Sequence, residues 1–318
     1  MRDLQRRLAG AGVRTDQTVP GVFCRGTERA VRQFQAQRGL REDGSCGPQT
    51  WSALVEASYA LGDRVLFLRS PMLRGDDVAE LQRLLGRFGF DAGRVDGIYG
   101  PQSASALGEF QRNVGLHGDG ICGFDTLRAL RRLRPRPVAT APVATVREDE
   151  QWRTAPRTLV GHRLVVGQTG GLSALVRALG RSLRQTGATV ITVDDPDGTR
   201  QAAAANHFEA SAFLGFTGTA QRCSVAYYAV PGFESVGGRR LAEAVGRALG
   251  PALGRPELSP AGMRMPVLRE TRMPAVLCEL GSVRYVTDHA RGVAAALTAA
   301  VVDWVAVAPP GLDDSVRG

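Results

Sequence analysis

The feature that most constrains this chain is an internal repeat within residues 1–134. Paired motifs recur 76 residues apart, as with Phe34 and Phe110, and each copy has apolar residues at helical spacing. Each copy therefore predicts three short amphipathic helices, so residues 1–58 and 72–134 should form two small all-α modules. The recurring pairs are Phe34-Gln35 with Phe110-Gln111, Gly39-Leu40 with Gly115-Leu116, Asp43-Gly44 with Asp119-Gly120, and Cys46-Gly47 with Cys122-Gly123.

The rest of the chain has a different pattern. Residues 135–158 are rich in Pro, Ala and charged residues, which predicts a linker. From residue 159 to 308, short β-branched runs alternate with helical stretches. Strands that are apolar on both faces and separated by helices predict an α/β domain with a mainly parallel sheet covered by helices. Residues 309–318 form a short tail, and the predicted fold class is multidomain.

The net charge of +9 raises the question of nucleic-acid binding, but the distribution of charge argues against it. All 40 Lys and Arg residues are in fact arginine. The one dense run, from Arg128 to Arg136, leads into the predicted linker, whereas a nucleic-acid site concentrates its charge on one element with aromatic residues interleaved. We therefore predict a solvated helix end there and no nucleic-acid partner.

The sequence also leads to expectations about the cellular location of the protein and about the redox state of its cysteines. The longest apolar stretch, residues 292–302, falls short of the ~20 residues that a membrane span needs, which predicts a buried helix and no membrane span. Residues 1–7 lack the apolar core of a secretory signal, so we expect a cytoplasmic location. The five cysteines are widely spaced and form no CxxC pair, which predicts free thiols and no cysteine zinc site.

The second repeat resembles the peptidoglycan-binding repeat family. The resemblance rests on Asp96-Gly97-Ile98-Tyr99-Gly100, Phe110-Gln111, Gly115-Leu116, Asp119-Gly120, Gly123, Thr126 and Ala129-Leu130. It implies peptidoglycan as a ligand, with Asp96, Tyr99 and Asp119 as candidate ligand-binding residues.

The first repeat departs from this pattern at two positions. Pro20 stands where the second repeat has Asp96, and Cys24 stands where it has Gly100. We therefore expect the second repeat to be the better binder. The alternative is that both repeats only pack as structural modules, since motif residues such as Phe110 belong to a core and carry no information about a ligand.

The third domain resembles the zinc N-acetylmuramoyl-L-alanine amidases. The resemblance is carried by Val267-Leu268-Arg269-Glu270-Thr271, by Met273-Pro274-Ala275-Val276-Leu277-Cys278-Glu279-Leu280-Gly281, and by Arg200, Ala205-Asn206 and Gly170-Gly171. It implies an ion held by His, Glu and His ligands, which activates water to cleave the amide between muramic acid and L-alanine while a later glutamate assists.

The positions that the resemblance assigns to metal ligands hold other residues in this chain. Thr169 stands at the first histidine, Thr217 stands at the second, and the segment with the ligand glutamate is missing after Gly171. The assisting glutamate is retained as Glu279. A positioned base contributes much less than a metal-bound water, so we expect no metal and no cofactor, and an insufficient catalytic role for Glu279 alone. Zinc would be required only if the chain were an active amidase.

Two arginines and four histidines are further candidates for ligand or metal binding. Arg200 and Arg269 lie beside the implied cleft and could engage carboxylate or phosphate groups of a ligand; structural ion pairs are the alternative for both. The four histidines fall outside the implied ligand positions, which predicts surface or helix-capping roles. They are His117, His162, His207 and His289.

Taken together, two wall-binding repeats and an amidase-like domain without zinc ligands resemble the actinobacterial CwlM-type family of amidase homologues. The resemblance implies a non-catalytic regulator of peptidoglycan synthesis that binds peptidoglycan fragments or precursors. It also implies a protein partner, for which the UDP-N-acetylglucosamine enolpyruvyl transferase is a candidate. The alternatives are an active N-acetylmuramoyl-L-alanine amidase and a passive wall anchor without a protein partner.

Overall fold

The structure is a computed structural model and describes residues 1–15, 17–133, 143–220 and 222–307. The chain divides into two compact units. One comprises Met1–Val146 with Val230–Phe233, and the other comprises Arg147–Ala229 with Glu234–Gly318. The end of the arginine run and residues 309–318, predicted to be a tail, lie outside the described residues.

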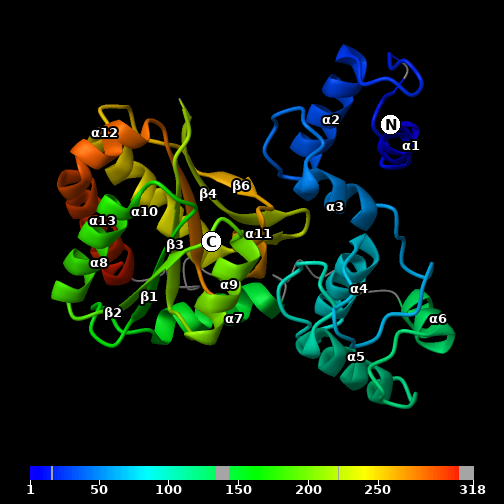
Figure 1. The fold of residues 1–318 in the computed structure, drawn as a ribbon. Coiled ribbons are helices and arrows are strands. Elements are labelled where there is room, and N and C mark those ends of the chain that lie inside the picture. The colour runs from blue at the N-terminus through cyan, green and yellow to red at the C-terminus, as the bar shows by residue number, and fades with distance from the viewer. Residues whose placement is uncertain (16, 134–142, 221, 308–318) are drawn as a thin grey trace, which may run out of the picture. The chain divides into compact units, whose positions relative to one another are not determined.

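The first unit contains the two predicted three-helix repeats (Figure 1). In each repeat the apolar faces of three short helices enclose a small core, which holds Phe34 in the first repeat and Phe110 in the second. Proline at the first position of the third helix and of the fifth suits a helix start, because its missing N–H has no partner there in any case. The helices are α1 (Arg2–Gly10), α2 (Arg25–Gln37), α3 (Pro48–Glu56), α4 (Asp76–Arg87), α5 (Pro101–Asn113) and α6 (Phe124–Arg132).

The core of the second repeat extends beyond its predicted start at residue 72. Leu66 is fully buried in that core, and its backbone pairs with Cys122 through an N–H···O bond of 2.8 Å donated by Cys122. Cys122 is itself buried, and Cys46 packs at the same place in the core of the first repeat. The five cysteines are all unpaired in the structure, in agreement with the prediction of free thiols.

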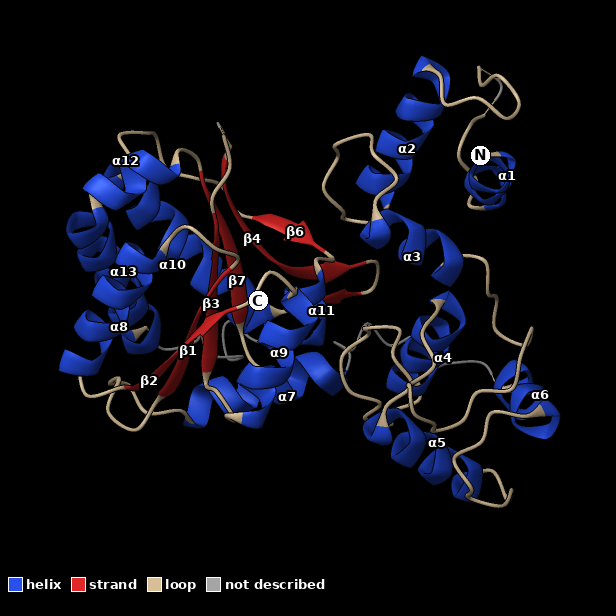
Figure 2. Cartoon of the chain, viewed as in Figure 1, coloured by secondary structure: helices blue, strands red, loops and turns tan. Residues whose placement is uncertain are grey.

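The second unit contains a sheet with the strand order β2-β1-β3-β7-β4-β5, and β6 pairs with β4 (Figure 2). Strands β1, β2, β3 and β7 are parallel, and β4 is antiparallel to β7, so the sheet is mainly parallel, as predicted. The strands are β1 (Arg163–Gln168), β2 (Thr189–Asp194), β3 (Ala212–Thr217), β4 (Cys223–Val230), β5 (Phe233–Glu234), β6 (Ala261–Met263) and β7 (Ala275–Leu280).

Helices cover both faces of this sheet (Figures 1 and 2). On one face, α8 (Ser173–Gln185), α10 (Val236–Ala252), α12 (Val283–Asp288) and α13 (Ala290–Ala306) enclose the main apolar core. On the other face lie α9 (Gly198–His207) and α11 (Pro266–Glu270), which pack against each other. Residues 292–302, predicted to be a buried helix, lie within α13, which buries one face of the stretch and leaves Val302 39% exposed. No helix among the described residues is long and apolar enough to cross a membrane.

A helix, α7 (Val143–Thr154), occupies part of the segment that the sequence predicts to be a linker. The carboxylate of Glu148 accepts hydrogen bonds from Ser235 Oγ (2.6 Å) and Val236 N (3.1 Å), at the start of α10. The ring centroids of Trp152 and Trp304 are 4.4 Å apart. These contacts of α7 are two hydrogen bonds and one aromatic pair. A helix packed in this way does not need a periodic apolar face, so its sequence lacks the apolar spacing that predicts a helix.

Candidate functional site

The carboxyl ends of β1, β3 and β7 lie at one edge of the sheet and bring three of the predicted site residues together. Thr217 is the last residue of β3, and it pairs in register with Glu279 of β7. Thr169 directly follows β1, and its backbone N–H donates to Phe216 O (3.2 Å), which continues the pairing of β1 with β3. Thr169, Thr217 and Glu279 therefore share one site, as the amidase resemblance implies.

Side-chain hydrogen bonds engage all three of these residues. The hydroxyl of Thr169 donates to Thr217 Oγ1 at 2.8 Å. Glu279 is only 8% exposed, and its Oε2 accepts from Ser224 Oγ at 3.0 Å, with the Arg222 guanidinium 3.9 Å away. The site thus contains a pair of neutral hydroxyls beside one anchored carboxylate.

The turn between β1 and α8 is closed by Gln168, a residue that the sequence analysis did not single out. Gln168 is buried, and its Oε1 accepts from Leu172 N (2.7 Å), just before α8 begins. Its Nε2 donates to Asp194 Oδ2 (2.8 Å) and to Ser173 Oγ (3.0 Å). The bonds to Leu172 and Ser173 satisfy polar groups at the helix start, and the bond to Asp194 links this turn to the end of β2, so α8 begins without a longer connecting segment. The sequence feature that could have indicated this role is a polar residue at the end of an otherwise apolar strand.

Val283, the first residue of α12, packs closely over the same turn. A Cβ atom on Gly218 would lie 2.3 Å from Val283 Cγ2, a distance that side chains do not adopt. A Cβ atom on Gly171 would lie 3.5 Å from Val283 Cγ1, and the φ of Gly171 is +80°. The segments that follow β1 and β3 therefore both approach Val283, and Gly218 cannot accept a side chain unless Val283 moves.

The residues at this edge do not fit a zinc ion. Zinc sites in proteins use Cys, His, Asp or Glu ligands, and a catalytic site needs three of them. Here the donors are the mutually bonded hydroxyls of Thr169 and Thr217 and a single carboxylate, Glu279. Across the described ranges, no group of three or more His, Cys, Asp or Glu residues has an arrangement that could hold a metal ion.

The two arginines predicted to bind a ligand occupy different environments. Arg200 lies in the first turn of α9, is exposed, and makes long ion pairs with Asp195 (3.9 Å) and Asp197 (3.8 Å). Helix α9 follows β2, which is three strand spacings, or about 14 Å, from β7. Arg269 lies on α11 and is 8% exposed. Arg200 therefore presents its guanidinium to solvent, whereas little of Arg269 can reach a ligand.

In the second repeat, the predicted ligand-binding residues take part in internal hydrogen bonds. Asp119 Oδ1 accepts from Gln111 Nε2 and Ile121 N, both at 2.8 Å, and the backbone hydrogen bond from Ile121 is the main cause of a lowered pKa for Asp119. Tyr99 is fully buried and donates its hydroxyl to Gly120 O at 2.6 Å, and burial raises the pKa of its phenol.

Asp96 belongs to a second network of the same kind. Its Oδ1 accepts from Gln82 Nε2 and Ile98 N, both at 2.8 Å. Gln82 Oε1 accepts from Gly97 N (2.8 Å), just as Gln111 Oε1 accepts from Gly120 N (2.8 Å). The second repeat therefore contains two glutamine-centred networks, in which Asp96 and Asp119 have equivalent places.

The first repeat has the same two networks with one difference. Gln35 bonds to Asp43 Oδ1 (2.8 Å) and accepts from Gly44 N (2.9 Å), like its equivalents in the second repeat. Gln5 accepts from Gly21 N (2.8 Å) but donates to the Val19 carbonyl (2.8 Å), because Pro20 supplies no carboxylate. The motif that identifies these repeats thus forms their internal framework.

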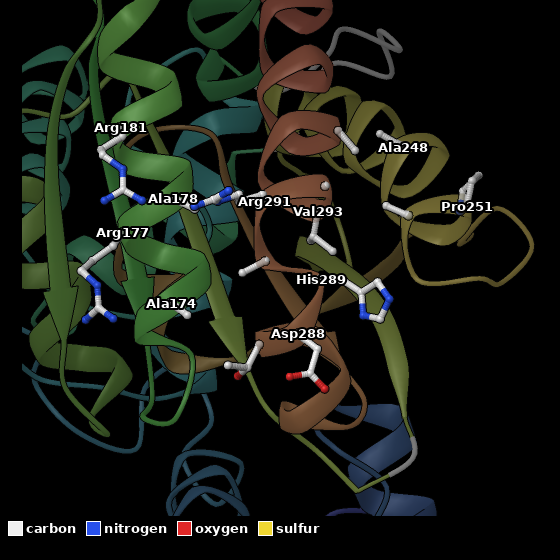
Figure 3. A pocket seen from close by; sticks show the side chains of 15 residues that line it. Ala174, Arg177, Ala178, Arg181, Ala248, Pro251, Asp288, His289, Arg291 and Val293 are labelled. Atoms are coloured by element: carbon white, nitrogen blue, oxygen red, sulfur yellow. The ribbon is translucent and has the colours of Figure 1, made fainter.

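A separate hollow of about 810 Å³ lies among α8, α10 and α13. Alanines of α8 and α10 line it, and the side chains of Arg177 and Arg181 project from α8 and that of Arg291 from α13 (Figure 3). Thr169, Thr217 and Glu279 are not among its lining residues. This hollow is therefore distinct from the site at the sheet edge.

Both parts of the chain are similar to known proteins. A family model described as a putative peptidoglycan binding domain matches residues 1–54 and 74–130. The chain is 35% identical over 305 residues to the N-acetylmuramoyl-L-alanine amidase CwlM of Mycobacterium tuberculosis, which covers 85% of this chain and 74% of that protein. It is 32% identical over 154 residues to the N-acetylmuramoyl-L-alanine amidase CwlL of Bacillus licheniformis, which covers 42% of this chain and 43% of that protein. Among solved structures, the N-acetylmuramyl-L-alanine amidase Ami1 of Mycobacterium smegmatis matches 46% of this chain and 98% of its own, with 13% identity and a TM-score of 0.40.

Proposed function

The chain belongs to the CwlM-type family of N-acetylmuramoyl-L-alanine amidase homologues, and we propose that it binds peptidoglycan fragments or precursors without hydrolysing them. The observation that carries the proposal is the hydrogen bond between Thr169 and Thr217 at the sheet edge. Two hydroxyls bonded to each other offer no strong metal ligand, and the turn closed by Gln168 leaves no segment there to supply one.

The role of the retained Glu279 follows from its surroundings. Without a metal to lower the pKa of water, a carboxylate base contributes only about 10²- to 10⁴-fold to a rate, which is far below what amide hydrolysis requires. Glu279 is held by Ser224 and lies beside Arg222. We assign it to the wall of a ligand cleft, where it orients neighbouring groups instead of activating water.

Binding is assigned to both units of the chain. The repeats supply a peptidoglycan-binding module, which the family match supports. At the sheet edge, the exposed guanidinium of Arg200 is suited to a carboxylate or phosphate of a precursor, and its present ion pairs are long enough to be exchanged for a ligand. Asp96 and Asp119 contribute by holding the turns that carry the neighbouring backbone in place.

We extend the proposal to regulation of cell-wall synthesis through a protein partner, with the UDP-N-acetylglucosamine enolpyruvyl transferase as the candidate. This part rests on membership of the family. A chain that senses precursors but does not consume them is suited to such a role.

The second candidate function is amide hydrolysis, because the relatives are named as amidases and because Glu279 is retained. A single set of experiments separates the two. Muropeptide and a nucleotide-linked precursor are titrated calorimetrically into the wild type, Arg200→Ala and Arg269→Ala, and the same samples are analysed for released peptide.

We expect binding without release of peptide, and a larger loss of affinity for Arg200→Ala than for Arg269→Ala. Release of peptide by the wild type at an enzymatic rate would contradict the proposal. Binding that both substitutions leave unchanged would assign recognition to the repeats alone.

A further inference from the structure

A second cavity lies at the opposite edge of the same sheet from Thr169 and Glu279. Its volume is about 450 Å³. It is lined by His162, Ser211 and Pro274, which directly precede β1, β3 and β7. Because these strands are parallel, the residues that precede them meet at the amino edge of the sheet. Helix α7 and the end of α13 complete the wall, through Trp152 and Trp304. In Figure 1, α7 and α12 mark the two opposite ends of the strands.

Three buried polar atoms around this cavity have no hydrogen-bond partner within the described part of the chain. They are Trp152 Nε1, Trp304 Nε1 and His162 Nδ1, and the three residues are 8%, 4% and 6% exposed. Native structures leave very few buried polar groups unpaired, since each one loses its hydration without compensation. Five such atoms occur among the described residues, and three of them belong to residues that line this one cavity.

The chemistry of these atoms defines what a ligand must offer. An indole N–H can only donate, so both tryptophans require an acceptor. The other nitrogen of His162 lies 3.1 Å from the Pro156 carbonyl, to which it donates, so Nδ1 accepts a hydrogen bond when the ring is neutral. A ligand therefore needs oxygen acceptors for two indole donors, and a hydroxyl or amino group would serve His162.

One lining cation, Arg272, is available to pair with an anionic acceptor. Of the lining carboxylates, Glu148 is engaged by Ser235 and Val236, and Glu209 pairs with Arg163 at 3.3 Å. The exposed guanidinium of Arg272 has no acidic partner among the residues that the structure describes. One uncommitted cation thus lies at the rim. The remaining wall is apolar and includes Met273, Pro274 and Pro156.

We propose that this cavity binds a small carboxylate that has an apolar body. The carboxylate oxygens accept from the indoles of Trp152 and Trp304 and pair with Arg272, and the apolar body packs against the rings and Met273. A volume of about 450 Å³ lies within the range of small-molecule sites. The site is separate from the sheet edge discussed above, so it stands independently of the proposed function.

The test uses the indole N–H signals of the full-length protein in a ¹H–¹⁵N correlation spectrum, with 3-phenylpropionate as the probe. The chain has three tryptophans, and the third, Trp51, lies in the first repeat and serves as an internal reference. Trp152→Phe and Trp304→Phe assign the signals while they preserve an aromatic ring. We expect saturable shifts of the Trp152 and Trp304 signals and none for Trp51.

Variants and a control ligand make the outcome decisive. Arg272→Gln removes an exposed charge and should weaken binding of the probe about tenfold, because a charge-assisted hydrogen bond is lost. Arg255→Gln, an exposed arginine after α10, should leave affinity unchanged. The cation 2-phenylethylamine, which has the same ring and no acceptor, should not shift the signals. Unmoved Trp152 and Trp304 signals, equal shifts with both compounds, or equal affinities for Arg272→Gln and the wild type would each overturn the proposal.

Discussion

The helical repeats and the α/β domain use their family motifs in different ways. In the repeats, the motif residues Gln111, Asp119 and Gly120 hydrogen-bond to one another and hold the turn between two helices. In the α/β domain, the run that identifies the family forms α11 and β7, whereas Thr169 and Thr217 occupy the positions expected to do the chemistry. A preserved motif in the repeats therefore reports the fold, whereas in the α/β domain the positions that the amidase resemblance assigns to metal ligands are the ones that bear on activity.

The largest expected contrast concerns thiol reactivity, between Cys24 of the first repeat and the buried cysteines. Hydrogen bonds from the backbone of Val19 and then of Thr27 lower the pKa of Cys24 from 9.0 to about 7, whereas burial raises that of Cys122 to about 12. Only the thiolate is nucleophilic, so near pH 7 Cys24 should react with iodoacetamide at least ~10³-fold faster. Its rate should rise with pH through about 7 and then level off.

Labelled peptides followed by mass spectrometry give this rate for each cysteine, and Cys278 serves as the reference in the α/β domain, because burial raises its pKa as well. Equal rates for Cys24 and Cys278 in the folded protein would contradict the difference in environment.

The next largest effect is a loss of local stability, expected from Gln111→Ala in the second repeat. The substitution removes hydrogen bonds to Asp119, Thr126 and the Ile121 carbonyl, and it leaves the Gly120 N–H without its acceptor. At about 1 kcal/mol for each bond, we expect a loss of about 3 to 4 kcal/mol in local stability. Hydrogen exchange of the backbone amides of residues 101–133 measures this loss of stability.

Gln5→Ala in the first repeat is the comparison, because the network of Gln5, which is the counterpart of Gln82, contains no carboxylate. Gln5 donates to Val19, Val22 and Thr27 and accepts from Gly21, but none of these bonds is to a carboxylate and two are long, at 3.2 and 3.4 Å. A smaller loss, about 2 to 3 kcal/mol, is therefore expected there. If the two substitutions cost the same, the carboxylates of Asp96 and Asp119 are not part of the framework, and a direct role in ligand binding becomes the better explanation for them.

A smaller effect is expected from Gln168→Ala in the α/β domain. The buried Leu172 N–H loses its acceptor and Asp194 loses a donor, which should cost about 2 kcal/mol. Hydrogen exchange at the start of α8 reports the change. Thr169→Val, which removes only the partly solvated bond to Thr217, should cost less than about 1 kcal/mol. A larger cost for Thr169→Val would mean that the hydroxyl pair, and not Gln168, holds this turn.

Sequence patterns predicted the elements that depend on local periodicity. The three-helix repeats and the mainly parallel sheet follow from apolar spacing, and both are present in the structure. Helix α7 was not predicted, because Glu148 and Trp152 contact residues 235 and 304, which lie far along the chain. The cavity at the amino edge was missed for the same reason, since its three unpaired atoms come from residues that are distant in sequence.

The site at the sheet edge was predictable only in part. The family pattern placed Thr169, Thr217 and Glu279 together, and the register of β1, β3 and β7 agrees. The burial of Tyr99 and of Arg269 was not predictable, because neither residue type is usually buried and both positions depend on tertiary packing. The role of Gln168 likewise depends on Asp194, which belongs to the neighbouring strand.

The central claim is that the α/β domain has kept the amidase fold and lost its metal chemistry, and zinc stoichiometry tests it most directly. Purified protein is incubated with zinc, freed of excess ion and subjected to elemental analysis. Because Thr169 and Thr217 provide hydroxyls in place of imidazoles, we predict well under one zinc per chain and a melting temperature that chelators do not change. One tightly bound zinc per chain, lost on chelation together with cleavage of the muramoyl-L-alanine bond, would contradict the account.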